Sequence, residues 1–269
     1  MKIINSILAI FLISISIISC DKVDGPYYQE GVVTPPTTRV LLEDYTGQQC
    51  PNCPAAAVIA HDLQNIYGDS NLIVVAIHAG FFAWPDATGT YTYDFTTPAG
   101  DAYDIFVKPS AYPVGTLDRI ENNSGYTFEK DDWASIISQR LYYKKTIEVE
   151  IEPIATDSIV SGEIEIEFID PISTESWVQI WITEDHILKP QIGEGDEYEH
   201  NHVLRGAVNG IWGEKLPSTN YAAGSTETIN ISDYKIGDDW VMENLSIVAF
   251  VYDGATKEVI QVNKKKIIE

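Results

Sequence analysis

Two cysteines separated by two residues, Cys50 and Cys53, are the side chains with the most distinctive chemistry in this sequence. The third cysteine, Cys20, stands much closer to the N-terminus. In an exported compartment, an isolated Cys-x-x-Cys is either a redox dithiol or a small structural disulfide. A closed zinc site needs four ligands, and the sequence has no second Cys-x-x-Cys to complete one. We therefore expect thiol chemistry, with no metal and no cofactor.

The pair stands at the junction of a predicted strand and a predicted helix. Residues Arg39 to Asp44 form a short apolar strand, and Ala55 to Tyr67 carry apolar residues at helical spacing before Gly68 ends the helix. The continuous apolar run from Asn71 to Ile77 is typical of a strand that is buried on both faces. Strand, helix and buried strand in this order indicate a βαβ unit with a parallel sheet.

This junction favours a reactive thiolate. At the helix N-cap, Cys50 would face free N–H groups and the positive end of the helix dipole, which lower the pKa of a thiol. Pro51 suits the first helical position, because its missing N–H would have had no partner there. One turn further, Cys53 would be more buried and placed to resolve a mixed disulfide. We expect the loop from Tyr45 to Gln49 to leave Cys50 accessible.

The N-terminal sequence predicts the compartment. A basic start precedes an apolar run from Ile3 to Ile18, which has the layout of a secretory signal peptide over residues 1–19. The run ends at Cys20 and resembles the bacterial lipoprotein box, in which the cysteine is acylated and becomes the new N-terminus. We therefore expect Cys20 to carry a lipid anchor, and residues 20–37, rich in Gly, Pro and Thr, to form a tether. This predicts a bacterial cell-envelope protein, attached most simply to the outer membrane.

The charge of the chain excludes one large class of partners. Lys and Arg number 17 against 40 Asp and Glu, which gives a net charge of −23. Nucleic-acid binding depends on Lys and Arg that displace counterions from phosphates, so we expect no nucleic-acid partner. Peripheral attachment to anionic lipid surfaces is disfavoured for the same reason.

The sequence pattern changes after residue 145. Ile147, Val149 and Ile151 alternate with glutamates, and the same alternation recurs from Ile164 to Phe168. One apolar and one acidic face suggest an antiparallel sandwich whose glutamates form a solvated sheet face. We therefore predict one domain over residues 38–145 and a second, all-β domain over 146–269. Further strand candidates in the second domain are residues 177–183, 226–231, 245–252 and 258–265.

Several motifs resemble those of known families. Leu41 to Gly47 ahead of Cys50-Pro51-Asn52-Cys53 resembles the active-site strand and turn of thioredoxins. This resemblance implies that Asp44 is the buried acid that helps to deprotonate the resolving thiol. It also implies that Pro113, in Ala111-Tyr112-Pro113-Val114, is the cis-proline that lies against the dithiol and shapes a peptide-binding edge.

The overall layout is similar to the outer membrane protein 28 family of Gram-negative lipoproteins. The shared features are the lipoprotein box, the Cys-x-x-Cys-Pro motif, a strand ending in His78, Tyr-Pro followed by Asp118-Arg119, and the segment His200 to Arg205. The resemblance implies an α/β thioredoxin-like domain, with a central mixed sheet and flanking helices, followed by a C-terminal immunoglobulin-like sandwich. It implies little about activity.

Histidines and aromatic residues supply further candidates. His78 ends a predicted strand at the edge where ligands bind in open sheets, so His78 and Tyr112 are candidate substrate contacts, although a hydrogen-bonded loop histidine is the simpler interpretation of His78. His200 and His202 would share one face of a strand and could bind a metal, but a structural pair is favoured without a third ligand. The aromatic residues either rim a ligand pocket or pack in the core; they are Phe81, Phe82, Trp84, Tyr91 and Tyr93.

Two functions from different classes remain open. In the first, the protein is a thiol–disulfide oxidoreductase of the envelope, whose partners are exported proteins or an envelope redox protein. Cys50 attacks, Cys53 resolves, Asp44 assists, and Pro113 shapes the binding edge. In the second, the protein is a non-catalytic surface-binding or adhesion lipoprotein in which the cysteines are a local staple.

We predict that Cys20 is the acylated residue. Replacing it in Cys20→Ala should release the protein from membranes as an unprocessed or soluble form, because the lipid chains supply the membrane affinity. Detergent partitioning of cell extracts measures this release, and partitioning unchanged from that of the parent chain would contradict the prediction.

Overall fold

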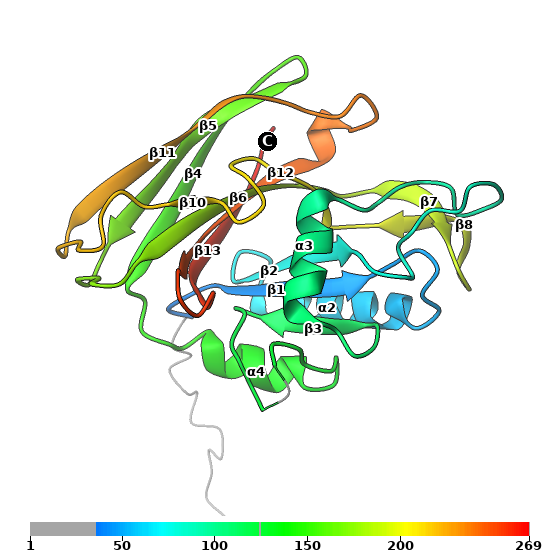
Figure 1. The fold of residues 1–269 in the computed structure, drawn as a ribbon, viewed down its shortest axis with the longest axis horizontal. Coiled ribbons are helices and arrows are strands. Elements are labelled where there is room, and N and C mark those ends of the chain that lie inside the picture. Colours follow the sequence, from blue (N-terminus) through cyan, green and yellow to red (C-terminus); the bar gives the residue numbers. More distant parts are fainter. Residues whose placement is uncertain (1–35, 124, 269) are drawn as a thin grey trace, which may run out of the picture. The chain divides into compact units, whose positions relative to one another are not determined.

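The computed structural model describes residues 36–123 and 125–268 (Figure 1). The predicted signal peptide, residues 1–19, and Cys20 lie outside the described residues, as does most of the predicted tether. None of the helices in the described part of the chain has the length and apolarity to cross a membrane.

Helices and strands alternate in the first part of the described chain. The strand–helix–strand unit predicted around the cysteines is present, and its two strands pair in parallel from Val40 opposite Leu72 to Thr46 opposite His78. A third strand pairs antiparallel with the first, with Val114 opposite Tyr45. The elements are β1 (Val40–Thr46), α2 (Cys53–Tyr67), β2 (Leu72–His78), α3 (Pro98–Val107), β3 (Val114–Leu117) and α4 (Trp133–Arg140).

Strands dominate the rest of the chain, as the change of period predicted. Each of the later strand candidates is a strand, with slightly different ends. The elements are β4 (Ile147–Thr156), β5 (Ile159–Phe168), β6 (Ser176–Glu184), β7 (Ile187–Gln191), β8 (Gly195–His200), β9 (Val203–Ala207), β10 (Glu214–Lys215), β11 (Ser225–Lys235), the 3-10 helix η2 (Met242–Asn244), β12 (Leu245–Asp253) and β13 (Val259–Lys266).

One mixed sheet runs through both parts of the chain. Its strand order is β13-β12-β6-β9-β2-β1-β3, with β10 pairing with β6 at one side. Strand β9 connects the two parts, because it pairs with β6 and also with β2, where Ala76 lies opposite Val203. The predicted boundary near residue 145 therefore marks a change of sequence pattern, while the sheet continues across it.

Alternation along β1 and β2 assigns their side chains to two faces. Val40, Leu42, Leu72 and Val74 pack in one core against α2 and α4. Their neighbours pack on the other face, in a second core that includes residues of α3 and of the later strands β6 and β12. Buried on both faces, these strands have the apolar sequence typical of central strands.

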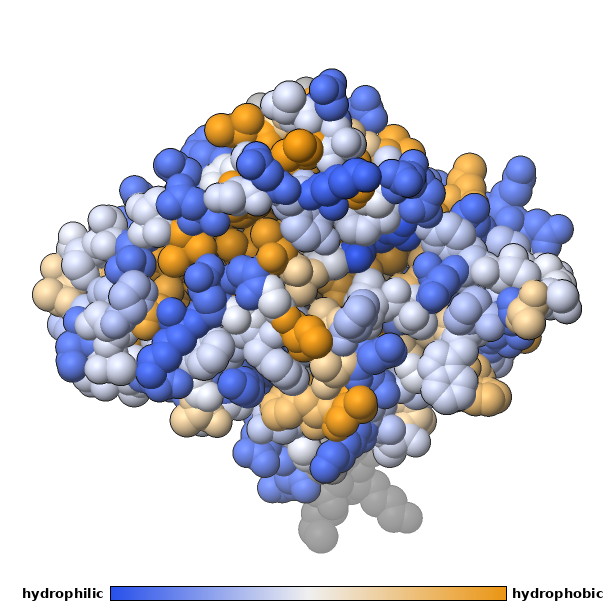
Figure 2. All heavy atoms as spheres, turned by 45° about the horizontal axis from the view of Figure 1, so that its top comes forward, coloured by the Kyte–Doolittle hydropathy of each residue, from blue (hydrophilic) through white to orange (hydrophobic). Residues whose placement is uncertain are grey.

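A separate three-stranded sheet, in the order β11-β5-β4, covers the other end of the main sheet (Figure 1). Its inward residues form a common core with residues of β6 and β12. Its outward face carries the predicted glutamates, of which Glu150, Glu163 and Glu165 are exposed. On the face shown in Figure 2, hydrophilic residues cover most of the surface and hydrophobic ones gather in patches between them.

A buried ion pair joins the strands at the centre. One edge of the Arg119 guanidinium donates two hydrogen bonds to the Glu43 carboxylate, from Nη2 to Oε1 at 2.7 Å and from Nε to Oε2 at 2.9 Å. Thr116 donates a third hydrogen bond to Glu43. Both side chains are almost completely buried, at 1 % and 0 % exposed. Five aromatic rings surround the guanidinium, with centroids between 4.9 and 6.0 Å from Cζ; they belong to Tyr103, Trp181, Trp212, Phe250 and Tyr252.

Removing one partner of this pair should be costly. In Arg119→Met the Glu43 carboxylate would be left buried without its counter-ion, so the free energy of unfolding should fall by about 3–5 kcal/mol. Urea unfolding of the parent and variant chains measures the difference. Lys144→Met, which breaks the exposed Lys144–Asp170 pair, serves as the control and should leave stability nearly unchanged. If the free energy of unfolding fell as little in Arg119→Met as in the control, the Glu43–Arg119 pair would not be a major contribution to stability.

Candidate functional site

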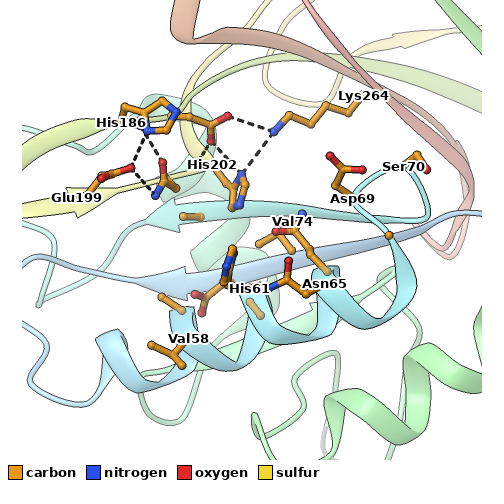
Figure 3. A pocket seen from close by; sticks show the side chains of 18 of the residues that line it. Val58, His61, Asn65, Asp69, Ser70, Val74, His186, Glu199, His202 and Lys264 are labelled. Carbon is orange, nitrogen blue, oxygen red and sulfur yellow. Dashed lines mark hydrogen bonds and ion pairs between the residues drawn. The ribbon is translucent and has the colours of Figure 1, made fainter.

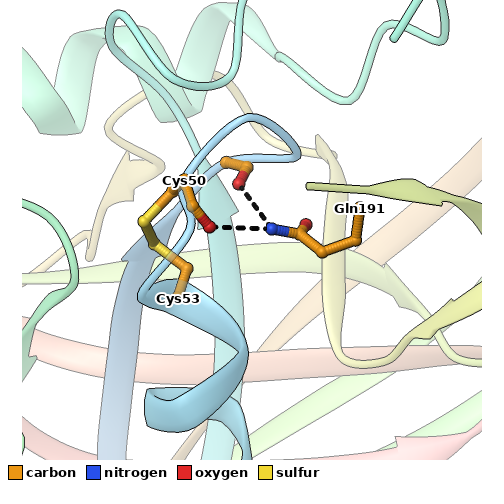
Figure 4. Close-up of a disulfide and its surroundings, with 4 residues drawn as sticks. Cys50, Cys53 and Gln191 are labelled. Carbon is orange, nitrogen blue, oxygen red and sulfur yellow. Dashed lines mark hydrogen bonds between the residues drawn. A yellow bond between two sulfur atoms is a disulfide. The ribbon is translucent and has the colours of Figure 1, made fainter. Parts of the chain in front are cut away.

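Cys50 and Cys53 form a disulfide at the start of α2, with a Cα–Cα distance of 5.4 Å (Figure 4). The helix begins at Cys53 and its N-cap is Asn52, so the prediction that Cys50 is the N-cap and Pro51 the first helical residue is wrong by two positions. The reason is the turn at residues 51–52, which precedes the helix and bonds Cys53 N–H to the carbonyl of Cys50 at 3.4 Å. Cys53 is therefore the cysteine that occupies the helix N-terminus.

Both cysteines are buried, which corrects the expectation that Cys50 is accessible. Cys50 is 1 % and Cys53 2 % exposed. A hairpin of β7 and β8 covers the loop, because Gln191 at the end of β7 donates to the carbonyl of Cys50 at 2.9 Å (Figure 4). The next residue, Ile192, donates its N–H to the carbonyl of Gln48 at 2.9 Å.

The segment from residue 80 to 95 covers the loop from another side. Gln48, which is itself fully buried, donates to the carbonyl of Tyr93 at 2.7 Å. Gln49 is held by two hydrogen bonds. Its backbone N–H donates to the carbonyl of Phe82 at 3.0 Å, and its side-chain amide donates to the carbonyl of Trp84 at 2.8 Å. At Gly47 a Cβ would lie 2.4 Å from the Phe82 backbone, so only glycine fits. Gln48 and Gln49, which were expected to leave Cys50 accessible, instead form hydrogen bonds with the segment that covers it.

Tyr112 and Pro113 lie at the same edge of the sheet as the dithiol. The Tyr112–Pro113 bond is cis, as predicted, and Pro113 directly precedes β3, whose first residue lies opposite Tyr45. The Tyr112 ring contacts Phe82 edge-on at 6.0 Å, and its hydroxyl donates to Asp104. Tyr112 thus packs on the covering segment. The exposed aromatic residues of that segment are Phe81 and Trp84, at 70 % and 57 %.

Asp44, predicted from the thioredoxin resemblance to be a buried acid, is 3 % exposed. Burial raises the pKa of its carboxyl to about 7, and its Oδ1 atom has no hydrogen-bond partner among the described residues. With Cys53, His78 and His200 it lines a cavity of about 30 Å³ beside the disulfide. The cavity therefore brings together three residues that the sequence analysis had singled out. They are the acid Asp44, the resolving cysteine Cys53 and His78, which ends β2.

His78 and His200 contact one another, although 122 sequence positions separate them. Their ring centroids lie 5.5 Å apart, and both contact Phe95, at 4.4 and 4.5 Å. Burial lowers the pKa of His78 well below its usual value, and the neighbouring His200 and Arg205 lower it further. Burial also lowers the pKa of His200 to about 4. Both rings are therefore neutral at physiological pH.

The interpretation of His200 and His202 as residues on one strand face is wrong. His200 ends β8 and is buried, whereas His202 follows the strand with a φ of 59° and binds Asp185 at 2.9 Å. The left-handed residue turns the chain between β8 and β9, which separates the two side chains. Within residues 36–123 and 125–268, no three His, Cys, Asp or Glu side chains are placed to hold a metal ion.

A larger groove of about 870 Å³ adjoins the small cavity (Figure 3). One wall is α2, with Val58, His61 and Asn65, and the opposite wall carries His186, His202 and Lys264. The two hollows share five lining residues, Asp44, Ala57, Ala76, Tyr198 and Asn201. The groove therefore leads from solvent to the interior side of the dithiol.

Sequence reasoning missed Gln191 as the residue that closes the dithiol and His200 as a neighbour of His78. Gln191 lies in a short polar strand with no clear alternation, and no local signal marks it. No local signal marks His200 as a neighbour of His78 either, because the contact joins residues that are 122 positions apart.

The fold and the site together define a mixed-sheet protein with few helices, a strand-rich C-terminal region and a buried Cys-x-x-Cys disulfide at a strand–helix junction. The chain belongs to the family of outer membrane protein Omp28, whose family model matches residues 100–269. This confirms the resemblance found in the sequence and places the protein at the outer membrane of the bacterial envelope. No match was found among curated proteins.

Two solved structures share the fold over most of this chain, and a third matches part of it. HBP35 of Porphyromonas gingivalis is 16% identical, with a TM-score of 0.68, over 86% of this chain and 76% of its own. A protein of Agrobacterium tumefaciens is 12% identical, with a TM-score of 0.54, over 87% of this chain and 96% of its own. A domain of the outer membrane lipoprotein Omp28 from P. gingivalis is 32% identical over 46% of this chain and 88% of its own, with a TM-score of 0.33.

The raised pKa of Asp44 predicts how stability depends on pH. The folded chain holds this proton up to about pH 7, whereas an unfolded carboxyl releases it near its ordinary value of 3.8, so stability falls as pH rises between these two values. Asp44→Asn removes the buried acid. At pH 8 it should be more stable than the parent, on the order of 4 kcal/mol, and below pH 4 the difference should vanish.

Chemical denaturation at a series of pH values measures this difference. Asp62→Asn, an exposed change on α2, is the matched control and should show no such pH dependence. If the free energy of unfolding of Asp44→Asn differed from that of the parent by the same amount at every pH, Asp44 would not be a buried acid with a raised pKa.

Proposed function

We propose that this Omp28-family protein exchanges disulfides with exported proteins through Cys50 and Cys53. Its first part, residues 38–145, then serves as a thioredoxin-like domain and its C-terminal part as an immunoglobulin-like sandwich. The observation that carries the proposal is the Asp44 carboxyl, buried without a hydrogen-bond partner beside Cys53. Such a group destabilises the fold, and perturbed acids of this kind concentrate at functional sites.

In this reaction the protein dithiol is the reductant and the substrate disulfide is the oxidant. The Cys50 thiolate attacks a substrate disulfide, which forms a mixed disulfide and releases one substrate thiolate. The Asp44 carboxylate then takes the proton of the Cys53 thiol, and the Cys53 thiolate attacks Cys50 Sγ. This step forms the protein disulfide and releases the second substrate thiolate. Two electrons pass to the substrate, whose thiolates take up protons from solvent, and the reverse sequence oxidises a substrate dithiol.

The cover over Cys50 must move for this reaction. Within the described residues, β7 and β8 pair with each other and with no other strand. The hairpin turns through Gly193 and Gly195, both with positive φ, and its tip is exposed. A two-stranded hairpin is a marginally stable element, so moving it costs less than opening the main sheet. Its contacts with the loop come from Gln191 and Ile192 beside the tip, so the tip can lift while His200, at the base of the hairpin, stays packed.

The burial of both sulfur atoms favours a second candidate function. A structural disulfide needs no accessible sulfur atom. This disulfide closes a turn whose loop is already hydrogen-bonded to the β7–β8 hairpin and to the segment from residue 80 to 95. In this alternative the protein is a non-catalytic surface-binding lipoprotein. In either case the partners are proteins of the envelope, attachment is through lipid at Cys20, and the acidic surface opposes nucleic acid.

The reduction potential separates the two functions. A working pair should have a potential between about −270 and −120 mV, the range of thiol–disulfide oxidoreductases, and structural bridges lie below about −300 mV. Equilibration of the full chain with glutathione buffers measures it. The variant Cys53→Ala should accumulate mixed disulfides through Cys50, because the resolving thiol is missing.

Cys50→Ala is the matched control and should trap far fewer partners, since Cys50 is the attacking thiol of the proposed exchange. A potential below about −300 mV, together with no trapped protein for Cys53→Ala, would leave the staple as the role of the disulfide.

A further inference from the structure

Polar side chains replace apolar ones where β1 and β2 approach the dithiol. On the face toward α2, Val40 and Leu42 of β1 are followed by Asp44, and Leu72 and Val74 of β2 by Ala76 and His78. Asp44 lies opposite Ala76, so the small alanine leaves space in front of the carboxyl. The cavity of about 30 Å³ occupies this end of the sheet face.

Three buried polar atoms belong to residues that line this cavity. They are Asp44 Oδ1, His78 Nδ1 and His200 Nε2, none of which has a hydrogen-bond partner among the described residues. Leaving such atoms unpaired lowers the stability of the fold. A cavity of this size with polar walls can hold one water molecule, which needs two to four polar partners. One water can donate to both ring nitrogens and accept from the Asp44 carboxylic acid.

The two rings are held in place by their neighbours. Phe95 stacks on His78, with an angle of 21° between the rings, and also contacts His200. Tyr198 contacts His200 edge-on at 4.8 Å. These ring contacts hold His78 and His200 in the wall of the cavity that Asp44 and Cys53 also line.

We propose that His78 and His200 are positioning residues that hold a water between them and Asp44, and that this water carries the proton between Asp44 and the Cys53 thiol. The proposal deepens the thiol–disulfide function above and rests on it. During resolution Asp44 is ionised, so the water donates one hydrogen bond to the carboxylate and the other to a histidine. The proton leaves Cys53 Sγ for the water as the water passes its own proton to the Asp44 carboxylate, and the water then donates to both ring nitrogens. No electrons move in this transfer, and the exchange itself remains the one balanced above.

The groups around the cavity determine its dependence on pH. His200 and Arg205 act on His78, and both rings remain neutral acceptors. Burial raises the pKa of the Tyr198 hydroxyl, and the negative charges of Glu194 and Asp44 raise it further. Of Asp44 and the two imidazoles, Asp44 alone has a pKa, about 7, near physiological pH. The residues shared with the groove connect it to solvent.

The reduced full chain and a chromogenic bis-nitrobenzoate disulfide test the relay. Attack by Cys50 releases the first coloured thiolate, and attack by Cys53 on the mixed disulfide releases the second. His78→Phe and His200→Phe keep a ring but remove the free nitrogen. Each should slow the second release at least tenfold and shift its pH midpoint, while the first release stays unchanged. His200→Gln, which retains a polar side chain, should recover part of the rate.

His186→Phe is the matched control, because His186 lines the groove but not the small cavity and is exposed. It should leave both releases unchanged. A second release with unaltered rate and pH midpoint in both cavity variants would overturn the relay while the exchange function stands. If the reduced parent releases neither thiolate, the exchange function fails and the relay fails with it.

A crystal structure at high resolution gives a readout that does not depend on activity. The relay requires a water within hydrogen-bond distance of Asp44 Oδ1, His78 Nδ1 and His200 Nε2 in the parent chain. An empty cavity, or a water bound to neither histidine, would overturn it.

Discussion

The Glu43–Arg119 pair is the interaction on which the rest of the structure depends. Two unit charges buried this completely need one another, since burial lowers the pKa of the Arg119 guanidinium, and the charge and hydrogen bonds of Glu43 are the largest of the causes that raise it. Glu43 comes from β1 and Arg119 follows β3, so the pair fixes the register of the strands that carry the site. The surrounding rings from β6 and β12 add the later strands to the same cluster.

This shared cluster explains why the two parts of the chain form one sheet. Trp181, Phe250 and Tyr252 bury their rings against a guanidinium that belongs to the earlier part, so neither part could be separated without exposing a charge and several aromatic faces. The same continuity brings β7, β8 and β9 beside β2. The hairpin that covers the dithiol is therefore supplied by the strand-rich part, and the dithiol by the α/β part.

The predictability of the fold followed the strength of its periodic signals. The unit around the cysteines and the strands β4, β5, β11, β12 and β13 have clear periods, and the sequence predicted them. The two strands of the hairpin β7–β8 have no alternating apolar pattern. Proline, glycine and charged residues interrupt them, in Ile187-Leu188-Lys189-Pro190-Gln191 and in Gly195 to His200. Its conformation depends on tertiary contacts with the Gln48–Cys50 loop, which no local pattern contains. For this reason the burial of Asp44 and Cys53 was predicted, while that of Cys50 was not.

The buried acid and the sealed disulfide place opposite demands on the fold. A staple alone is served best by an apolar surrounding, because each polar atom without a partner lowers stability. Beside Cys53, however, the face that is otherwise packed with Leu42 and Val74 ends in a carboxyl and two imidazoles. Substituting apolar residues there would preserve the disulfide and stabilise the chain. In the proposed exchange, these polar groups serve the thiol that loses and regains a proton, and the tip of the self-paired hairpin supplies the opening.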